Sequence, residues 1–195
     1  MARPRPGDKR ARILDAAVIE IAGHGYYHTT VAMIATRAGV ADGTIYLYFA
    51  SKEEILVGLF ERAMERFIAE GLRLPVEGDA AQRLRALITL HLNLLGRDRD
   101  LAIVFQVELR HSLHFLDLFS RSRLREYLEA IGAIIVEGQR EGLFRADIDP
   151  LLAAKVIFGI LDEMATDWLL TKRNTRLAAR ADAIGDLVLR GLGAG

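Results

Sequence analysis

The sequence contains no cysteine, only four prolines and no long uninterrupted apolar run. Without cysteine, the chain can form no disulfide, and it has no thiol nucleophile and no cysteine ligand for a metal. Hydrophobic residues make up 51% of the chain, yet no apolar run approaches the roughly 18 residues that suggest a membrane span. The N-terminal residues lack the apolar segment of a secretion signal. We therefore expect a globular protein of the cytoplasm.

The sequence also lacks the short motifs of the common enzyme classes. It has no G-x-S-x-G nucleophile elbow, no Walker phosphate loop and no H-E-x-x-H zinc motif. The G-x-G at 23–25 follows an expected helix rather than a strand, so it does not indicate a nucleotide site. The carboxylates of Asp162 and Glu163 are adjacent and would point about 100° apart on a helix, away from a common substrate. We expect no catalytic residues, no enzymatic activity and no cofactor.

Positive charge is concentrated at the N-terminal end of a chain whose net charge is zero. Residues 1–52 contain seven Lys or Arg and four Asp or Glu, whereas residues 53–195 contain 19 and 22. Five of the basic residues fall within the first twelve positions: Arg3, Arg5, Lys9, Arg10 and Arg12. A basic segment on a neutral chain is suited to contact with phosphates. The alternative is a solvated basic tail.

Hydrophobic periodicity predicts an all-α fold. Apolar residues recur at helical spacing, and no segment alternates as a strand would. The spacing predicts long helices over 8–23, 52–70, 124–142, 151–170 and 176–192.

Two of the expected helices have clear N-terminal signals. Ser51 and Glu54 have the spacing of a capping box at the start of the helix over 52–70. Asp149 directly precedes Pro150, which is the arrangement of an N-cap followed by proline in the first turn. These signals place the two helix starts within a residue or so.

The segment 29–49, TTVAMIATRAGVADGTIYLYF, predicts two short helices joined by a tight turn. The first would begin at Thr29 or Thr30, whose hydroxyl can cap it, and would end at Gly39 in a left-handed conformation. The second would span about 41–48. A helix pair of this kind is typical of DNA-reading units, although the shape also occurs in proteins that do not bind DNA.

The string GVADGTIYLYF, followed by SKEEIL, resembles the DNA-binding signature of the TetR family of bacterial transcriptional regulators. This resemblance implies that the second helix of the pair is the recognition helix. One departure is Ala41, where many members carry a serine that caps this helix. The candidate DNA contacts are Thr30, Asp42, Gly43, Thr44, Tyr46, Tyr48 and Lys52.

Charge and periodicity divide the chain into two expected domains. Residues 1–52 would form the N-terminal arm and a three-helix DNA-binding domain, and 53–195 a helical bundle for ligand binding and dimerisation, entered through a connector helix at 52–70. The helix at 151–170 has more apolar surface than the core of one subunit requires, and the helix at 176–192 carries one narrow apolar seam. We therefore expect a homodimer held by a four-helix bundle of these helices. An ordinary C-terminal core pair is the alternative. Two-fold symmetry suits a palindromic operator in double-stranded DNA.

Two C-terminal stretches, RDLAIVFQVELR and IFGILDEMATDW, resemble TetR-type regulators of fatty-acid degradation. The resemblance implies a repressor that long-chain acyl-CoA releases from DNA, with the acyl chain buried and the CoA phosphates nearer solvent. Apolar candidates for the ligand tunnel are Phe105, Leu109, Phe115, Ile131, Ile135, Phe158, Leu161 and Trp168. Basic candidates for the CoA phosphates are Arg110, His111 and Arg140.

Other interpretations of the helical domain remain open. The effector can be another lipophilic ligand or a drug, because an acyl tail needs only apolar walls. Glu108, His111 and His114 share a helix face at i, i+3 spacing, but three metal ligands from one helix make a weak site, and we expect no metal. A helical adaptor that binds no DNA is a further alternative, and each apolar candidate can be plain core.

Overall fold

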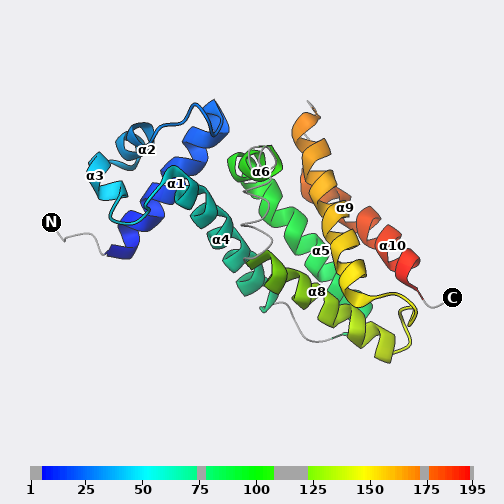
Figure 1. Cartoon of the computed structure of the whole chain (residues 1–195). Helices are drawn as coiled ribbons and strands as arrows, with labels where there is room; N and C mark the ends of the chain where they lie inside the picture. The colour runs from blue at the N-terminus through cyan, green and yellow to red at the C-terminus, as the bar shows by residue number, and fades with distance from the viewer. Residues whose placement is uncertain (1–5, 74–77, 108–122, 172–175, 194–195) are drawn as a thin grey trace.

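The computed structural model describes residues 6–73, 78–107, 123–171 and 176–193, and within these ranges every regular element is helical (Figure 1). The prediction of an all-α fold is confirmed. None of the described helices is both long and apolar enough to cross a membrane. The elements are α1 (Pro6–His24), α2 (Val31–Ala38), α3 (Asp42–Ile45), α4 (Lys52–Gly71), α5 (Ala80–Arg97), α6 (Arg99–Gln106), α8 (Arg123–Arg140), α9 (Pro150–Leu170), a 3₁₀ turn (Leu177–Arg180) and α10 (Ala181–Leu192).

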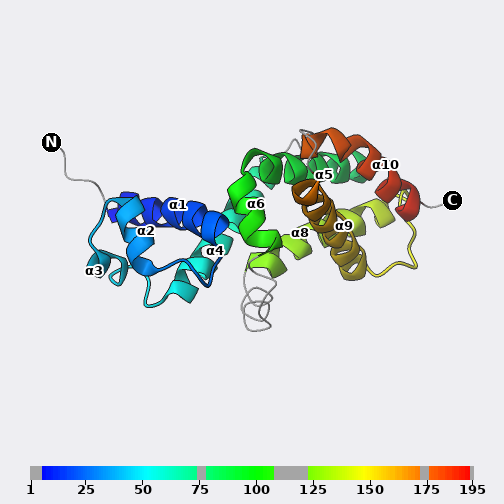
Figure 2. The same ribbon diagram turned by 90° about the horizontal axis from the view of Figure 1, so that it is seen from above.

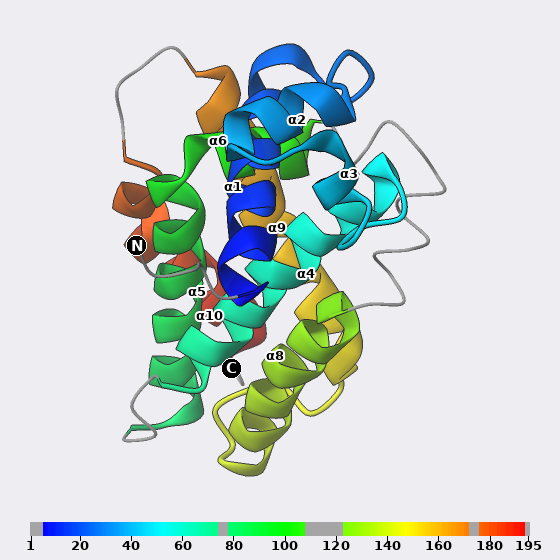
Figure 3. The same cartoon turned by 90° about the vertical axis from the view of Figure 1, so that its left-hand side faces the viewer.

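The helices form two groups along an elongated molecule. Helices α1, α2 and α3 lie together at one end, and α4 leads from them towards the larger bundle of α5, α6, α8, α9 and α10 (Figure 1). The view from above shows the same separation, with α6 on the side of the bundle that faces α1 (Figure 2). Seen from the end, α1 and α2 lie in front of the bundle (Figure 3). Helix α1 packs directly on α6, so the two groups also touch away from α4.

The predicted N-caps of α4 and α9 are present. The Ser51 hydroxyl accepts a hydrogen bond from the Glu54 N–H at 3.2 Å, and the Asp149 carboxylate accepts one from the Leu152 N–H at 2.7 Å. The second half of the predicted capping box is displaced by one residue, because the Glu54 carboxylate accepts from the Ala50 N–H at 2.6 Å. Both helix starts are therefore set by local side-chain bonds.

Helix α3 is shorter than the predicted span of 41–48. Its regular part covers Asp42–Ile45, and a tight turn follows in which the Tyr48 N–H donates to the Ile45 carbonyl at 2.9 Å. Such i→i+3 bonds are common where a short helix ends. Ala41 makes no side-chain cap, as its methyl group requires. The turn brings Phe49 inward, where it is 4% exposed.

The connection between α8 and α9 depends on a glycine. Gly142 ends the helix with a φ of 73°, a conformation that costs glycine little. The chain then folds back so that the Phe144 ring lies on Gly138, where an added Cβ would stand 2.1 Å from the ring. The Arg145 N–H donates to the carbonyl of Leu192 at 2.9 Å and ties this connection to the end of α10.

Candidate nucleic-acid interface and ligand cavity

The start of α2 is held by two threonines with different roles. Thr30 is the N-cap, and its hydroxyl accepts from the Met33 N–H at 3.2 Å. Thr29 is 1% exposed. Its hydroxyl lies within donating distance of two backbone carbonyls earlier in the chain, those of Glu20 at 3.0 Å and Gly25 at 2.9 Å. Of the two predicted cap positions, the structure therefore selects Thr30, while Thr29 joins the loop to α1.

The end of α2 is fixed to α1 by two arginines. Gly39 has the predicted left-handed conformation, with φ at 63°. The guanidinium of Arg12 donates to the carbonyls of Ala38 and Gly39, so this member of the basic N-terminal segment supports the helix pair. Arg37 forms an ion pair with Glu20, which is 6% exposed on α1. These bonds hold α2 at a defined angle to α1.

The turn that includes α3 presents an exposed surface on a rigid base. Ile45 and Phe49 are buried and anchor the turn in the core. Between them, Tyr46 is 58% exposed and Leu47 is 81% exposed. Gly43 is also exposed, and an added Cβ there would meet no atom within 4 Å. The surface can therefore approach a groove closely.

The other predicted DNA contacts of the helix pair differ in exposure. Thr30 and Asp42 are exposed, whereas Thr44 and Tyr48 are half-buried. The Tyr48 ring packs against the core. The motif did not single out Leu47, although it is more exposed than either neighbouring tyrosine; its position between them was the available signal.

Lys52 has a structural role that the sequence did not suggest. Its ammonium group donates to the carbonyls of Tyr26 at 2.7 Å and Thr29 at 2.9 Å, and it lies 4.3 Å from the centroid of the Tyr26 ring. Partial burial lowers the pKa of Lys52. Because an ammonium group has three donors, one remains for a phosphate, so the predicted DNA contact stays a prediction.

Two residues of the predicted basic arm, Arg3 and Arg5, lie outside the described residues. Arg10 is exposed on α1, with its guanidinium 5.2 Å from the centroid of the Phe49 ring. Cation and ring attract each other at this distance. Arg10 thus stands beside the turn that carries Tyr46.

The predicted ligand residues differ in their burial. Ile131, Ile135 and Leu161 are fully buried in the core, and Phe105, Phe158 and Trp168 are half-buried against it. Arg140 is exposed at the end of α8. The remaining ligand candidates lie outside the described residues: Leu109, Arg110, His111 and Phe115. Glu108 and His114, which with His111 made up the alternative of a metal site, also lie outside them.

An apolar cavity of about 310 Å³ opens between α4, α5 and α8. This volume lies at the lower end of the roughly 300–1,000 Å³ of small-molecule sites. At its rim Leu72 is 80% exposed, whereas His91 and Tyr127 are 3% and 4% exposed. None of the predicted ligand residues that the structure describes lines it. The lining consists of Phe67, Ile68, Gly71, Leu72, Leu87, Leu90, His91, Tyr127, Ala130, Ala133 and Ile134.

The buried wall of this cavity is aromatic and carries two polar groups. The His91 Nδ1 and the Tyr127 hydroxyl are 2.8 Å apart and share a hydrogen bond. The His91 ring stacks on Phe67 with centroids 4.8 Å apart, and Phe158 meets both His91 and Tyr127 edge-on. Burial lowers the pKa of His91 to about 4, so the ring is neutral at pH 7.

His91 was not among the site residues predicted from the sequence. The available signal was a histidine in the apolar series of residues 84–95. Its pairing with Tyr127 depends on how α5 packs on α8, and the sequence alone does not reveal this.

Polar side chains join α6 to α9 inside the bundle. The Gln106 amide donates to the Asp162 carboxylate at 2.7 Å and accepts from the Thr166 hydroxyl at 2.9 Å. At the end of α9, the guanidinium of Arg99 lies 5.4 Å from the centroid of the Trp168 ring. Trp168, predicted to line a tunnel, therefore packs against a cation at the α6–α9 junction.

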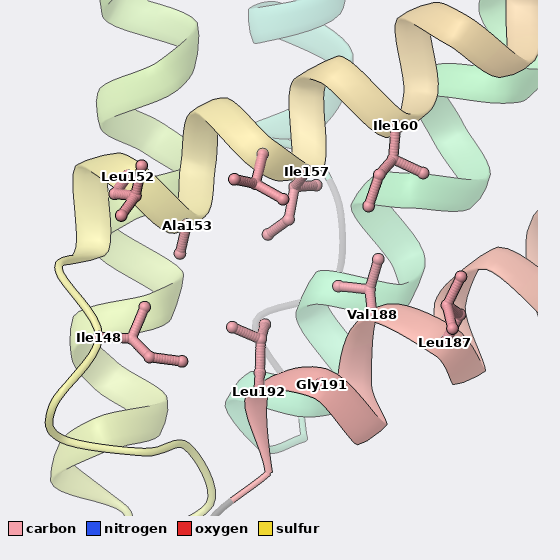
Figure 4. A pocket seen from close by; sticks show the side chains of 10 residues that line it. Ile148, Leu152, Ala153, Ile157, Ile160, Leu187, Val188, Gly191 and Leu192 are labelled. Carbon is pink, nitrogen blue, oxygen red and sulfur yellow. The ribbon is translucent and has the colours of Figure 1, made fainter.

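A second apolar groove, of about 270 Å³, lies between α9 and α10 (Figure 4). Several of its side chains are unusually exposed for their type: Leu152 is 57% exposed, Val156 54% and Leu187 67%. Gly191 on α10 leaves part of the surface without a side chain. This face belongs to the two helices that the sequence predicted to form the dimer interface.

Comparison with known families and proteins covers almost the whole chain. Residues 13–59 match the family model "Bacterial regulatory proteins, tetR family", and residues 60–191 match "YsiA-like protein, C-terminal region". A fatty acid metabolism regulator protein of Bacillus subtilis (strain 168) is 39% identical over 193 residues, covering 98% of each chain. The HTH-type transcriptional repressor KstR2 of Rhodococcus jostii is 30% identical over 157 residues, covering 76% of this chain and 74% of its own.

Two solved structures have nearly the same fold. The fatty acid degradation regulator FadR from Bacillus halodurans superposes with a TM-score of 0.89 at 40% identity, covering 98% of both chains. FadR from Bacillus subtilis, in complex with stearoyl-CoA, gives a TM-score of 0.88 at 38% identity, covering 93% of this chain and 98% of its own.

Proposed function

Because the chain belongs to the TetR family of bacterial transcriptional regulators, we propose that it represses genes of fatty-acid degradation. In this proposal it binds palindromic operator DNA as a homodimer, and long-chain acyl-CoA releases it. The observation that carries the proposal is the similarity, over 98% of both chains, to a fatty acid metabolism regulator. The stearoyl-CoA complex of a protein 38% identical to this chain supports the choice of effector.

The turn that includes α3 is the proposed reading surface. Gly43 brings backbone close to a phosphate, because no side chain intervenes, and Tyr46 is exposed beside it. We add Leu47 to the predicted contacts, since an exposed apolar side chain in the major groove can recognise a thymine methyl group. Ile45 and Phe49 hold these side chains in place from below.

The exposed face of α9 and α10 is the proposed dimer interface. Covering Leu152, Val156 and Leu187 with the same face of a second subunit would remove apolar side chains from water on both subunits. A two-fold arrangement of these helices makes a four-helix bundle, the geometry expected for residues 151–192. The same symmetry gives two reading surfaces for the two half-sites of an operator.

Helix α4 is the proposed connection between effector and DNA. Its first residue, Lys52, holds the loop between α1 and α2, and its last turns, with Phe67 and Gly71, line the cavity. A ligand in the cavity therefore contacts the helix that positions the reading surface. The effector must favour the DNA-incompetent arrangement by about 1.4 kcal/mol for each tenfold loss of operator affinity.

Selection of DNA from a random duplex pool with the purified protein tests the DNA part of the proposal. We expect an inverted repeat whose half-sites are about one helical turn apart, or about 34–36 Å. Sequence-independent binding, with no inverted repeat enriched, would contradict the DNA part of the proposal. Calorimetric titration with stearoyl-CoA, stearate and a cationic dye separates an acyl-CoA effector from the alternative of another lipophile or drug.

A further inference from the structure

We propose that His91 and Tyr127 form the recognition site for the thioester carbonyl of the acyl-CoA effector. Their hydrogen-bonded pair would donate one hydrogen bond to the carbonyl oxygen, inside the cavity between α4, α5 and α8. This inference rests on the proposed function and adds to it the group that distinguishes a thioester from other lipophiles.

The hydrogen-bonded pair of His91 and Tyr127 has two protons that it can donate. A neutral imidazole carries one N–H and a phenol carries one O–H. The bond between His91 Nδ1 and the Tyr127 hydroxyl uses one of these two donors. Whichever residue donates, the other proton has no acceptor, because Nε2 of His91 and the Tyr127 hydroxyl make no further hydrogen bond with the described residues. The pair therefore keeps one unused donor.

The unused donor belongs to a residue of the cavity wall. His91 and Tyr127 are more than nine-tenths buried, and both line the cavity. This donor has no acceptor among the described residues, so a ligand oxygen in the cavity would give it a hydrogen bond. The stacking of His91 on Phe67 and the edge contacts with Phe158 hold both rings in position.

The cavity favours an acceptor without charge. Among the described residues that line this cavity, none carries a charge at neutral pH, since burial keeps His91 unprotonated. A free carboxylate would be buried there without a cation, at a large cost in free energy. A thioester carbonyl is an uncharged acceptor on an apolar chain, and it fits both the walls and the donor. The CoA part would remain at the mouth, where Leu72 and Arg73 are exposed.

The test compares two ligands that differ only at the carbonyl. Stearoyl-CoA and its thioether analogue, with a methylene in place of the carbonyl, are titrated calorimetrically into the full-length protein. We expect the thioester to bind about three- to tenfold more tightly, the value of one hydrogen bond. In the double variant His91→Phe/Tyr127→Phe the two ligands should bind equally. Tyr27→Phe, which makes the same change at an exposed tyrosine, should keep the preference.

Each result is decisive because the thioether reports on folding and on the cavity independently of the carbonyl. Unchanged thioether affinity in the double variant shows that the cavity is intact. If wild-type protein binds both ligands equally, or if the preference persists in the double variant, the recognition site is wrong while the acyl-CoA effector stands. If neither CoA compound binds to wild-type protein, the proposed effector and the recognition site both fail.

Discussion

Replacing Lys52 by methionine separates a structural role from a DNA-contacting role for this residue. The change keeps the length of the side chain but removes the ammonium group that donates to the Tyr26 and Thr29 carbonyls. Hydrogen bonds from charged groups contribute about 1.5–3 kcal/mol each. The contact with the Tyr26 ring adds about 0.5–1 kcal/mol. Part of this total is offset, because the methionine no longer has to bury a charge.

We therefore expect Lys52→Met to lower the free energy of unfolding by about 2–3 kcal/mol. For a chain of this size, that loss corresponds to a fall of about 4–12 °C in the midpoint of thermal unfolding. Far-UV circular dichroism measures the midpoint, at one protein concentration because the proposed dimer makes it concentration-dependent. Lys155→Met is the matched control, since Lys155 is exposed on α9 and its ammonium makes no bond with the described residues.

The contrary result is equally specific. If Lys52 serves mainly to contact a phosphate, Lys52→Met will unfold at the wild-type temperature. It will also weaken binding to all DNA sequences alike and reduce the salt dependence of binding by about one counterion. That outcome would refute the assignment of Lys52 to the support of the loop between α1 and α2.

Four further predictions follow from the structure. Gly138→Ala should lower the free energy of unfolding in urea by about 1–3 kcal/mol, because its Cβ would stand 2.1 Å from the Phe144 ring. Gly43→Ala should leave the unfolding midpoint unchanged or slightly higher, yet weaken operator binding about tenfold in fluorescence anisotropy, since the new methyl group meets only solvent in the free protein. Leu187→Glu should shift the sedimentation coefficient to that of a monomer, because it places charge in the proposed interface. The pKa of His91 is lowered to about 4 from its ordinary 6.5, so between these pH values the unfolded chain binds more protons than the folded protein. The contribution of His91 to the free energy of unfolding should therefore rise with pH across that window and be constant above it. This contribution should be absent in His91→Phe.

Features governed by neighbouring residues could be predicted from the sequence. Thr30, Gly39 and Asp149 mark helix ends through bonds that reach only three or four residues along the chain. The long helices could also be predicted, because their apolar residues recur three or four positions apart. Helix α3 was predicted too long, because an uncapped start at Ala41 and a tight final turn leave little regular helix between them.

The roles and site residues that were not predicted depend on contacts between distant parts of the chain. Lys52 was identified through its motif, but its two carbonyl partners lie 26 and 23 positions away, in a loop whose path no local pattern describes. His91 and Tyr127 are 36 positions apart, on different helices. The apolar candidates Ile131 and Leu161, predicted to line a tunnel or to be plain core, are fully buried, and hydrophobicity alone does not distinguish a core residue from a cavity wall.

The central claim is that binding of acyl-CoA to the dimer determines whether its two reading surfaces fit the operator. Its most direct test is the fluorescence anisotropy of a labelled duplex carrying the selected inverted repeat, measured with the protein while stearoyl-CoA is added. We predict that anisotropy falls to the value of free DNA at micromolar stearoyl-CoA, with no fall for stearate. Unchanged anisotropy at concentrations where calorimetry shows the ligand to be bound would contradict the account.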